Sequence, residues 1–326
     1  MSSEIVATRF TAEQAAALVP RRSAGGHKWS VGGLMIVAGA PHFIGAAALC
    51  AMSAGRIGAG VVVLAVPRGL IGPLVTLVPE TAFAAIPDGD LGSNGRRLQE
   101  AIGDRAERCS AFVIGPGLGT DDYAVRLVRF LLGLHESAGP ARMGFGLPTT
   151  HNVDGSDSPS LLSYERPIVV DADGLNILSG IEEWWTRVPA GRLVLTPHSG
   201  EMAKLLDAHV DDVNSSPQAA ALEAARRFRQ TVVLKGTPTY VTDGTLVNVA
   251  ADAPLSLLTA GSGDVLAGAI GGLLAQGVEP VDAANLAVLL GSTAARSLEA
   301  EFGELGVVAS DLPKQAAREL ARLAAQ

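Results

Sequence analysis

Short apolar runs alternate with helix-like segments along most of the 326 residues. The runs are continuous rather than alternating with polar residues, which is typical of strands buried on both faces of a parallel sheet. They lie at Leu34–Gly39, Val61–Val66, Ala111–Gly115, Pro167–Asp171, Arg192–Thr196 and Thr231–Gly236. We therefore predict a three-layer α/β/α sandwich with a mostly parallel central sheet and a site at the carboxyl ends of its strands.

Helices are expected between these strands and after the last of them. Thr11 and Gln14 have the spacing of a capping box, which predicts a helix start. The predicted helices are Thr11–Val19, Ala46–Arg56, Asn94–Arg105, Asp122–His135, Val281–Glu299 and Asp311–Ala325. Within Tyr240–Val249, Asp243 and Gly244 join two short β runs, which predicts a hairpin.

One segment differs from the rest in composition. Residues 137–166 are rich in Gly, Pro, Ser and Asp, which is typical of a flexible surface insertion. We predict a single domain over residues 1–326 that carries this insertion.

Composition excludes several classes of partner. The formal charge of −8 and the pI near 5.3 argue against a nucleic-acid or anionic-membrane surface. The uncharged apolar run Val265–Val278 is shorter than the roughly 20 residues of a membrane span. The N-terminus lacks the apolar core of a signal peptide. Cys50 and Cys109 lie in apolar contexts and are expected to be reduced core residues, so we predict a cytoplasmic protein.

A turn of small residues at Ala260–Gly263 precedes Asp264 and a long apolar helix. The first amides of a helix have no partner within it, and glycines let the backbone approach a phosphate closely. The amides of Gly261, Ser262 and Gly263 are therefore candidates for an anion hole. Asp264 could act there as a general base on a hydroxyl. A structural alternative is that Asp264 only stabilises the first turn of the helix.

Four further motifs follow predicted strands, where the site is expected. Gly115–Gly119 (GPGLG) indicates a tight turn, although its spacing fails the dinucleotide fingerprint. Asp171 and Asp173 could hold Mg²⁺ or water near phosphates, or Asp173 could be an N-cap. His198 lies at a helix start, with Glu201 as its possible capping partner. Lys235–Thr239 offers donors for a nucleotide phosphate or ribose.

Taken together, the motifs resemble the ADP-dependent (S)-NAD(P)H-hydrate dehydratase family of the ribokinase-like superfamily, over roughly residues 27–313. The matching blocks are HKWSVGGLMIVAG, FIGAAALCAMSAGRIGAGVVVLAV, IGPGLG, VVDADGLN, LTPHSGEMAKLL, VVLKGTPT, TAGSGDVLAG and GVVASDLP. Three positions depart from the family's usual residues: Ala260 in place of Gly, Ser199 in place of Pro and Gly174 in place of Ala. The 137–166 segment has no counterpart in the family.

The resemblance implies the roles of individual residues. Asp264 matches the catalytic aspartate, and Gly263 matches a contact to the AMP moiety. The nucleotide-binding segment corresponds to Lys235, Gly236, Thr237, Pro238 and Thr239. The positions that contact the hydrated dinucleotide correspond to Ala46, Gly117, His198 and Asp264.

The implied reaction is the ADP-dependent dehydration of (6S)-NADHX or NADPHX to NADH or NADPH, with release of AMP and phosphate. Its expected cofactors are ADP as co-substrate and Mg²⁺, with a magnesium ion near Asp171. The resemblance also implies a homo-oligomer, with a tetramer favoured, and an NAD(P)HX epimerase on a separate chain. Two alternatives remain at this point: an ATP-dependent kinase of a small alcohol, and a nucleotide-binding sensor without catalysis.

Overall fold

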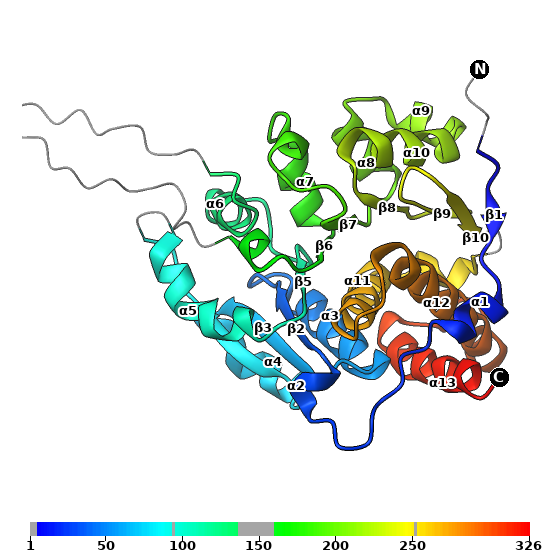
Figure 1. Cartoon of the computed structure of the whole chain (residues 1–326), viewed down its shortest axis with the longest axis horizontal. Helices are drawn as coiled ribbons and strands as arrows, with labels where there is room; N and C mark the ends of the chain where they lie inside the picture. Colours follow the sequence, from blue (N-terminus) through cyan, green and yellow to red (C-terminus); the bar gives the residue numbers. More distant parts are fainter. Residues whose placement is uncertain (1–4, 93–94, 136–159, 251–252) are drawn as a thin grey trace, which may run out of the picture.

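A single mixed sheet runs through the centre of the computed structural model, which describes residues 5–92, 95–135, 160–250 and 253–326 (Figure 1). Within these residues the strand order is β1-β10-β9-β8-β7-β6-β5-β2-β3-β4. Neighbouring strands are parallel except around β9, which is antiparallel to both β8 and β10. The strands are β1 (Thr8–Arg9), β2 (Gly33–Val37), β3 (Val61–Pro67), β4 (Ala82–Ile86), β5 (Ala111–Ile114), β6 (Ile168–Val170), β7 (Leu193–Leu195), β8 (Thr231–Leu234), β9 (Thr239–Thr242) and β10 (Val247–Ala250).

Alternate side chains of the central strands point to opposite faces and build two cores. Leu34 and Ile36 pack on one face, whereas Met35 and Val37 pack on the other. The first face is covered by α1 (Ala12–Ala17), α3 (Ile44–Ile57), α4 (Ile71–Leu77), α11 (Ser262–Ala275), α12 (Pro280–Phe302) and α13 (Leu312–Ala324). The second face is covered by α5 (Arg96–Glu107), α6 (Asp122–Leu131), α7 (Asp173–Ser179), α8 (Ser199–Leu206), α9 (Val210–Ser215) and α10 (Pro217–Phe228). The predicted three-layer sandwich is confirmed (Figure 1).

Helices α3 and α11 pack against each other at very short range under the sheet. A Cβ on Gly268 would lie 2.1 Å from the Cys50 carbonyl oxygen, and a Cβ on Gly272 would lie 2.9 Å from that of Ala54. Only glycine fits at such a distance from a neighbouring backbone. The small-residue run after Asp264 therefore serves packing, and it places the N-terminus of α11 over the middle of the sheet.

The sheet changes winding direction between β2 and β5. From β2 the chain moves outward through α3 to β3 and through α4 to β4, and it then returns to place β5 beside β2. Parallel sheets of this kind form a crevice at the carboxyl ends of the two strands flanking such a switch. The loops after β2, β5, β6, β7 and β8 therefore share one edge of the sheet, and the four motifs predicted to follow strands lie there.

Most predicted elements agree with the structure to within a few residues. The Thr11–Gln14 capping box and the antiparallel pair of β9 and β10 are confirmed, and Cys50 and Cys109 are buried free thiols. The sequence reading did not identify β1, β4, α4, α9 or α10, and it extended the helix at α6 four residues too far. None of the helices in the described ranges has the length and hydropathy needed to cross a bilayer.

The predicted insertion lies mostly outside the described residues. Its last part, from residue 160, is described and packs against the domain. Leu161–Tyr164 form a 3-10 helix, and Leu161 is only 2% exposed. The prediction of a flexible segment therefore fails for this part and stays a prediction for residues 137–159.

Candidate functional site

Strands β7 and β8 bring His198 and Lys235 together at the carboxyl edge of the sheet. The pairing of the two strands continues one step beyond them, because the Lys235 N–H donates to the Pro197 carbonyl at 2.8 Å and His198 and Lys235 form a parallel bridge. His198 is also the N-cap of α8, where its Nδ1 accepts from the Gly200 N–H at 3.0 Å. The Glu201 carboxylate accepts from the His198 N–H at 2.8 Å, so the predicted capping role of Glu201 is confirmed.

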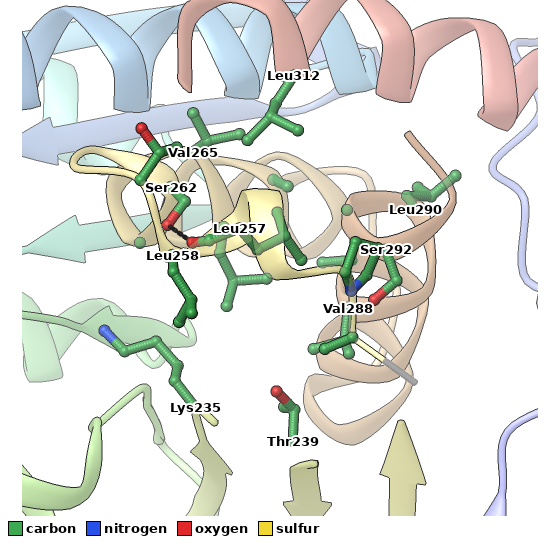
Figure 2. Close-up of a pocket in the computed structure, with 18 of the residues that line it drawn as sticks. Lys235, Thr239, Leu257, Leu258, Ser262, Val265, Val288, Leu290, Ser292 and Leu312 are labelled. Carbon is green, nitrogen blue, oxygen red and sulfur yellow. Dashed lines mark hydrogen bonds between the residues drawn. The ribbon is translucent and has the colours of Figure 1, made fainter. Parts of the chain in front are cut away.

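A cavity of about 400 Å³ opens beside Lys235, between the sheet edge and α12 (Figure 2). Its sheet side is formed by the segment predicted to bind the nucleotide, and its other walls are largely apolar. Thr239 closes the segment on itself, because its Oγ1 donates to the Gly236 carbonyl at 2.8 Å. The residues that line the cavity include His198, Lys235, Gly236, Thr237, Thr239, Leu257, Leu258, Gly261, Ser262, Gly263, Val265, Val288, Gly291, Ser292, Leu312 and Ala316.

The N-terminus of α11 forms one wall of this cavity. Gly261 is its N-cap in the left-handed region, with φ 91°, and no side chain caps the helix. The Ser262 hydroxyl donates instead to the Leu257 carbonyl at 2.7 Å, which holds the preceding loop against the helix (Figure 2). A 14-residue helix that begins without a side-chain cap leaves first-turn amides available to an anion. The wall is thus suited to a phosphate group.

Lys235 belongs both to the cavity and to a buried group of charged residues beside it. Its Nζ lies 2.8 Å from Asp171 Oδ1 and 3.8 Å from Glu201 Oε2. The Thr196 hydroxyl donates to the same Asp171 oxygen at 2.6 Å. Asp171 is 1% exposed, whereas the Lys235 side chain keeps 21% of its surface accessible. The pair therefore holds a cation at the boundary between the protein interior and the cavity.

The charges of this group shift one another's pKa values. Burial lowers the pKa of Lys235, but the carboxylates of Asp171, Glu201 and Asp264 raise it by more, so the amine stays protonated. Burial also raises the pKa of Glu201, against the opposing effect of Lys235.

Asp264 directly follows Gly261–Gly263, the turn that lines the cavity. Burial is the main cause that raises its pKa to about 7, the charge of Asp171 raises it further, Lys235 lowers it and Asp173 raises it slightly. A Cβ on Gly261 would lie 3.8 Å from Asp264 Oδ2, and a Cβ on Gly263 would lie 3.4 Å from Lys235 Nζ. A carboxyl group with a pKa near neutrality is suited to accept a proton from an alcohol.

The loop after β5 contacts the start of α3 across the switch point. Gly115, Gly117 and Gly119 all have positive φ, at 126°, 62° and 76°, as the predicted tight turn requires. A Cβ on Gly117 would lie 2.7 Å from the Cβ of Phe43 and 2.9 Å from the Cβ of Ala46. The structure thus brings together Gly117 and Ala46, two of the residues predicted to contact the dinucleotide.

The structure divides the predicted site residues between two places. Lys235, Gly236, Thr237, Thr239, Gly261, Ser262, Gly263 and His198 line the cavity. Asp264, Ala46, Gly117 and Pro238 do not line it. Asp264 interacts electrostatically with Lys235, so the acid lies near a cavity residue although it is not itself part of the lining. The prediction of Asp173 as an N-cap is wrong, because Ala172 is the N-cap of α7 and the Asp173 carboxylate accepts from the Gly119 N–H.

Sequence reasoning missed the apolar half of the cavity and the hydroxyl of Thr196. Leu257 and Leu258 lie just before the turn at Ala260–Gly263, but their apolar side chains are also what a core would contain. Val288 and Gly291 on α12 had no signal, because only the packing of α12 against the sheet edge turns them toward the cavity. Thr196 and Asp171 are each the last residue of a predicted strand. Since parallel strands end at the same edge of a sheet, this was the one available clue to their contact.

The predicted magnesium ion near Asp171 can be tested against the donors present. Across the described ranges there is no group of three His, Cys, Asp or Glu side chains arranged to hold a metal. Asp171 Oδ1 is already occupied by Lys235 and Thr196. Magnesium commonly keeps several waters and binds through phosphates together with one or two carboxylates. The residues therefore fit an ion brought by a nucleotide, with Asp171 supplying at most one contact.

Comparison with known proteins agrees with this geometry. A family model described as NAD(P)H-hydrate dehydratase matches residues 34–138 and 141–318. The match includes residues 141–166, so the expectation that the 137–166 segment has no counterpart in the family is wrong for that part. The bifunctional NAD(P)H-hydrate repair enzyme Nnr of Moorella thermoacetica is 34% identical over 308 residues, which cover 93% of this chain and 52% of that protein. The chain thus spans about half the length of the bifunctional relatives it matches.

A second relative has nearly the same length. The ADP-dependent (S)-NAD(P)H-hydrate dehydratase of Xanthomonas campestris pv. campestris is 31% identical over 311 residues, which cover 93% of each protein. The ADP/ATP-dependent NAD(P)H-hydrate dehydratase of Bacillus subtilis, co-crystallised with ATP and Mg²⁺, matches in structure with a TM-score of 0.72. That match has 22% identity and covers 99% of this chain and 100% of the other, which confirms the ribokinase-like fold. On the extent of the family match and the identity of these relatives, the chain belongs to the NAD(P)H-hydrate dehydratase family.

Proposed function

We propose that this protein dehydrates (6S)-NADHX and NADPHX to NADH and NADPH, with ADP as co-substrate and with release of AMP and phosphate. The observation that carries the proposal is the position of Asp264. Its carboxyl group has a pKa near 7, and it follows directly on the uncapped turn that lines a nucleotide-sized cavity. A general base and an anion site are thus adjacent, as transfer of a phosphoryl group to an alcohol requires.

The cavity is assigned to ADP. The adenine would lie among the apolar side chains of Leu257, Leu258 and Val288, and the phosphates would face the amides of the Gly261–Gly263 turn. Lys235 would neutralise phosphate charge from the sheet side, since its side chain lines the cavity and keeps 21% of its surface accessible. Magnesium bound with ADP would supply further neutralisation of the phosphates.

The hydrated nicotinamide is assigned to Ala46 and Gly117, which do not line the cavity, and to His198, which lines its wall and would contact both substrates. Asp264 would take the proton of the ring hydroxyl while the hydroxyl oxygen attacks the β-phosphorus, and the bond to the bridging oxygen breaks to release AMP. The ring nitrogen then donates its electron pair as the C–O bond breaks and phosphate leaves. Loss of a proton from the neighbouring ring carbon restores the dihydronicotinamide.

Three wider features belong to the same proposal. We assign the protein to the cytoplasm, as a homo-oligomer with a tetramer favoured, working beside an NAD(P)HX epimerase on a separate chain. The Xanthomonas relative, which is matched over 93% of its length, is named only as a dehydratase. Light scattering after size-exclusion chromatography tests the tetramer.

The decisive experiment is a repair assay. Hydrated NADH is incubated with the protein and ADP, and the absorbance band of reduced nicotinamide is followed while AMP and phosphate are quantified. The proposal requires one AMP and one phosphate for each NADH regained. A parallel reaction with ATP and small alcohols tests the kinase alternative. Phosphorylation of an alcohol without recovery of the band would replace the proposed function.

A further inference from the structure

The loop Gly115–Gly119 is held by hydrogen bonds from two neighbouring loops. On one side the Gly39 N–H, after β2, donates to the Pro116 carbonyl at 2.9 Å. On the other side the Gly119 N–H donates to Asp173 Oδ2, at the start of α7, at 2.8 Å. The loops after β2, β5 and β6 are therefore linked at the point where the sheet changes direction.

This loop needs such links because its own sequence does not define one conformation. Three of its five residues are glycines, and each adopts a positive φ. Glycine has the largest conformational freedom to lose on ordering. The first glycine is fixed by packing, since a Cβ on Gly115 would lie 1.8 Å from the Asp171 carbonyl oxygen. The last glycine, Gly119, is not fixed by packing, because a Cβ there would have open space around it. Its N–H is held instead by the Asp173 carboxylate.

The Asp173 side chain does not do what an acidic residue at a helix start usually does. Acidic side chains there commonly accept from the amides of their own first turn. In α7 no side chain makes such a cap bond, and the Asp173 carboxylate reaches across to a different loop. Its bond joins residues 54 positions apart in the chain. A charged acceptor makes a stronger hydrogen bond to an amide than a neutral one.

We propose that Asp173 is a positioning residue that fixes the Gly115–Gly119 loop in the conformation that receives the nicotinamide half of the substrate. This inference rests on the proposed function for the identity of the substrate. Gly117, in the middle of the loop, packs against Phe43 and Ala46, so an error in the position of Gly119 would move the surface on which the ring lies. The nucleotide cavity is bounded by other segments and does not depend on this loop.

The test compares Asp173→Ala with Asp173→Asn. The amide oxygen of asparagine can still accept from the Gly119 N–H, whereas alanine removes the acceptor. Asp122→Ala is the matched control, since Asp122 is an exposed carboxylate just beyond the loop and is not among the groups that shift the pKa of Asp264. Each variant is made in the full chain and first compared with the wild type by thermal unfolding.

Two measurements then separate the outcomes. Hydrogen exchange of the peptide that contains residues 115–121, measured without ligands, reports whether the loop is held. Steady-state kinetics report KM for the hydrated dinucleotide, KM for ADP and kcat. In Asp173→Ala we expect faster exchange in this peptide and a rise of about tenfold in KM for the hydrate. KM for ADP should change by less than about twofold, and in Asp173→Asn and Asp122→Ala the exchange of this peptide and the KM for the hydrate should resemble those of the wild type.

Three results would overturn the inference. Unchanged exchange in Asp173→Ala would mean that the bond does not hold the loop. Faster exchange with an unchanged KM for the hydrate would mean that the loop does not position the substrate. An equal loss in Asp173→Asn and Asp173→Ala would mean that the charge itself is needed. If the wild type fails to repair the hydrate, the proposed function fails, while the exchange experiment still decides whether Asp173 holds the loop.

Discussion

The cavity and the carboxylate cluster near the N-terminus of α11 differ in the kinds of groups that form them. The cavity side is lined by aliphatic side chains, backbone amides and hydroxyls, with Lys235 as its cation. The other side gathers the carboxylates of Asp171, Asp173 and Asp264, and their charges act on one another. The turn that lines the cavity and precedes Asp264 consists of Gly261, Ser262 and Gly263, which have little side-chain bulk.

This difference indicates a division of labour. An apolar slot with amides at one end holds a nucleotide by shape and by phosphate contacts, and it needs no titrating group of its own. A buried cluster of carboxylates raises the pKa of one member into the range where it can exchange a proton. Lys235 lines the cavity and is paired with Asp171, so in the proposed function it would neutralise phosphate charge without leaving Asp171. The following predictions test this division, from the largest expected effect to the smallest.

The sharpest test is Asp264→Asn, which removes the base and leaves the cavity lining unchanged. We expect turnover of the hydrate to fall by about a thousandfold, since a positioned general base contributes about 10²–10⁴ in rate. Affinity for ADP should stay within about threefold of the wild-type value, because Asp264 does not line the cavity. Repair kinetics and calorimetric titration with ADP measure the two effects. Loss of both together would show that the two sides are not separate.

Lys235→Met should lower the free energy of unfolding, because it removes the cation that the cavity and the carboxylate cluster share. Asp171 is 1% exposed and would lose its partner. Breaking a buried pair in this way costs about 3 kcal/mol of unfolding free energy, which urea unfolding measures. Lys204→Met is the control, since Lys204 is exposed and bonds to Asn176, and we expect a change below about 0.5 kcal/mol. The double variant Asp171→Asn/Lys235→Met should recover part of the lost stability.

A pair of glycine variants should affect one substrate each. Gly291 lines the cavity and has open space where a Cβ would stand, so the side chain of Gly291→Val should occupy volume that the adenine of ADP needs. We expect KM for ADP to rise about tenfold while KM for the hydrate is unchanged. Gly117→Ala places a Cβ 2.7 Å from Phe43 at a φ of 62°, and it should raise KM for the hydrate by a similar factor. Interchanged effects would mean that the two substrates are assigned to the wrong sides.

The pH dependence of kcat/KM should follow the ionisation of Asp264. Because the carboxyl group must be ionised to accept a proton and its pKa is about 7, kcat/KM should fall about tenfold for each pH unit below 7 and level off above it. A pH series of the repair assay, with the stability of NADH in acid controlled for, measures this. A flat profile between pH 5.5 and 8 would exclude Asp264 as the base.

The same shift predicts a change in stability. The folded protein binds this proton more tightly than the unfolded chain, so the Asp264 contribution to the free energy of unfolding falls as pH rises from about 4 to about 7. Asp264→Asn should therefore gain stability over the wild type at pH 8 and gain little at pH 4. Thermal unfolding at the two pH values checks the sign of the effect.

The sequence by itself determined the layered architecture and the edge at which the site lies. Continuous apolar strands such as Val61–Val66 are favourable only when both faces are covered, and parallel strands place the loops that follow them at one edge. Asp264 after a glycine turn, Lys235 after a strand and His198 at a helix start were all visible for that reason.

Only the tertiary structure decided which of these residues work on the same side. The pKa of Asp264 depends on burial and on the charge of Asp171, which is 93 positions away in the chain. The cavity depends on α12 packing beside the sheet edge, and the role of Asp173 depends on an amide from another loop. Such effects arise from distances across the fold, whereas hydrophobic periodicity and motif spacing record only neighbours along the chain.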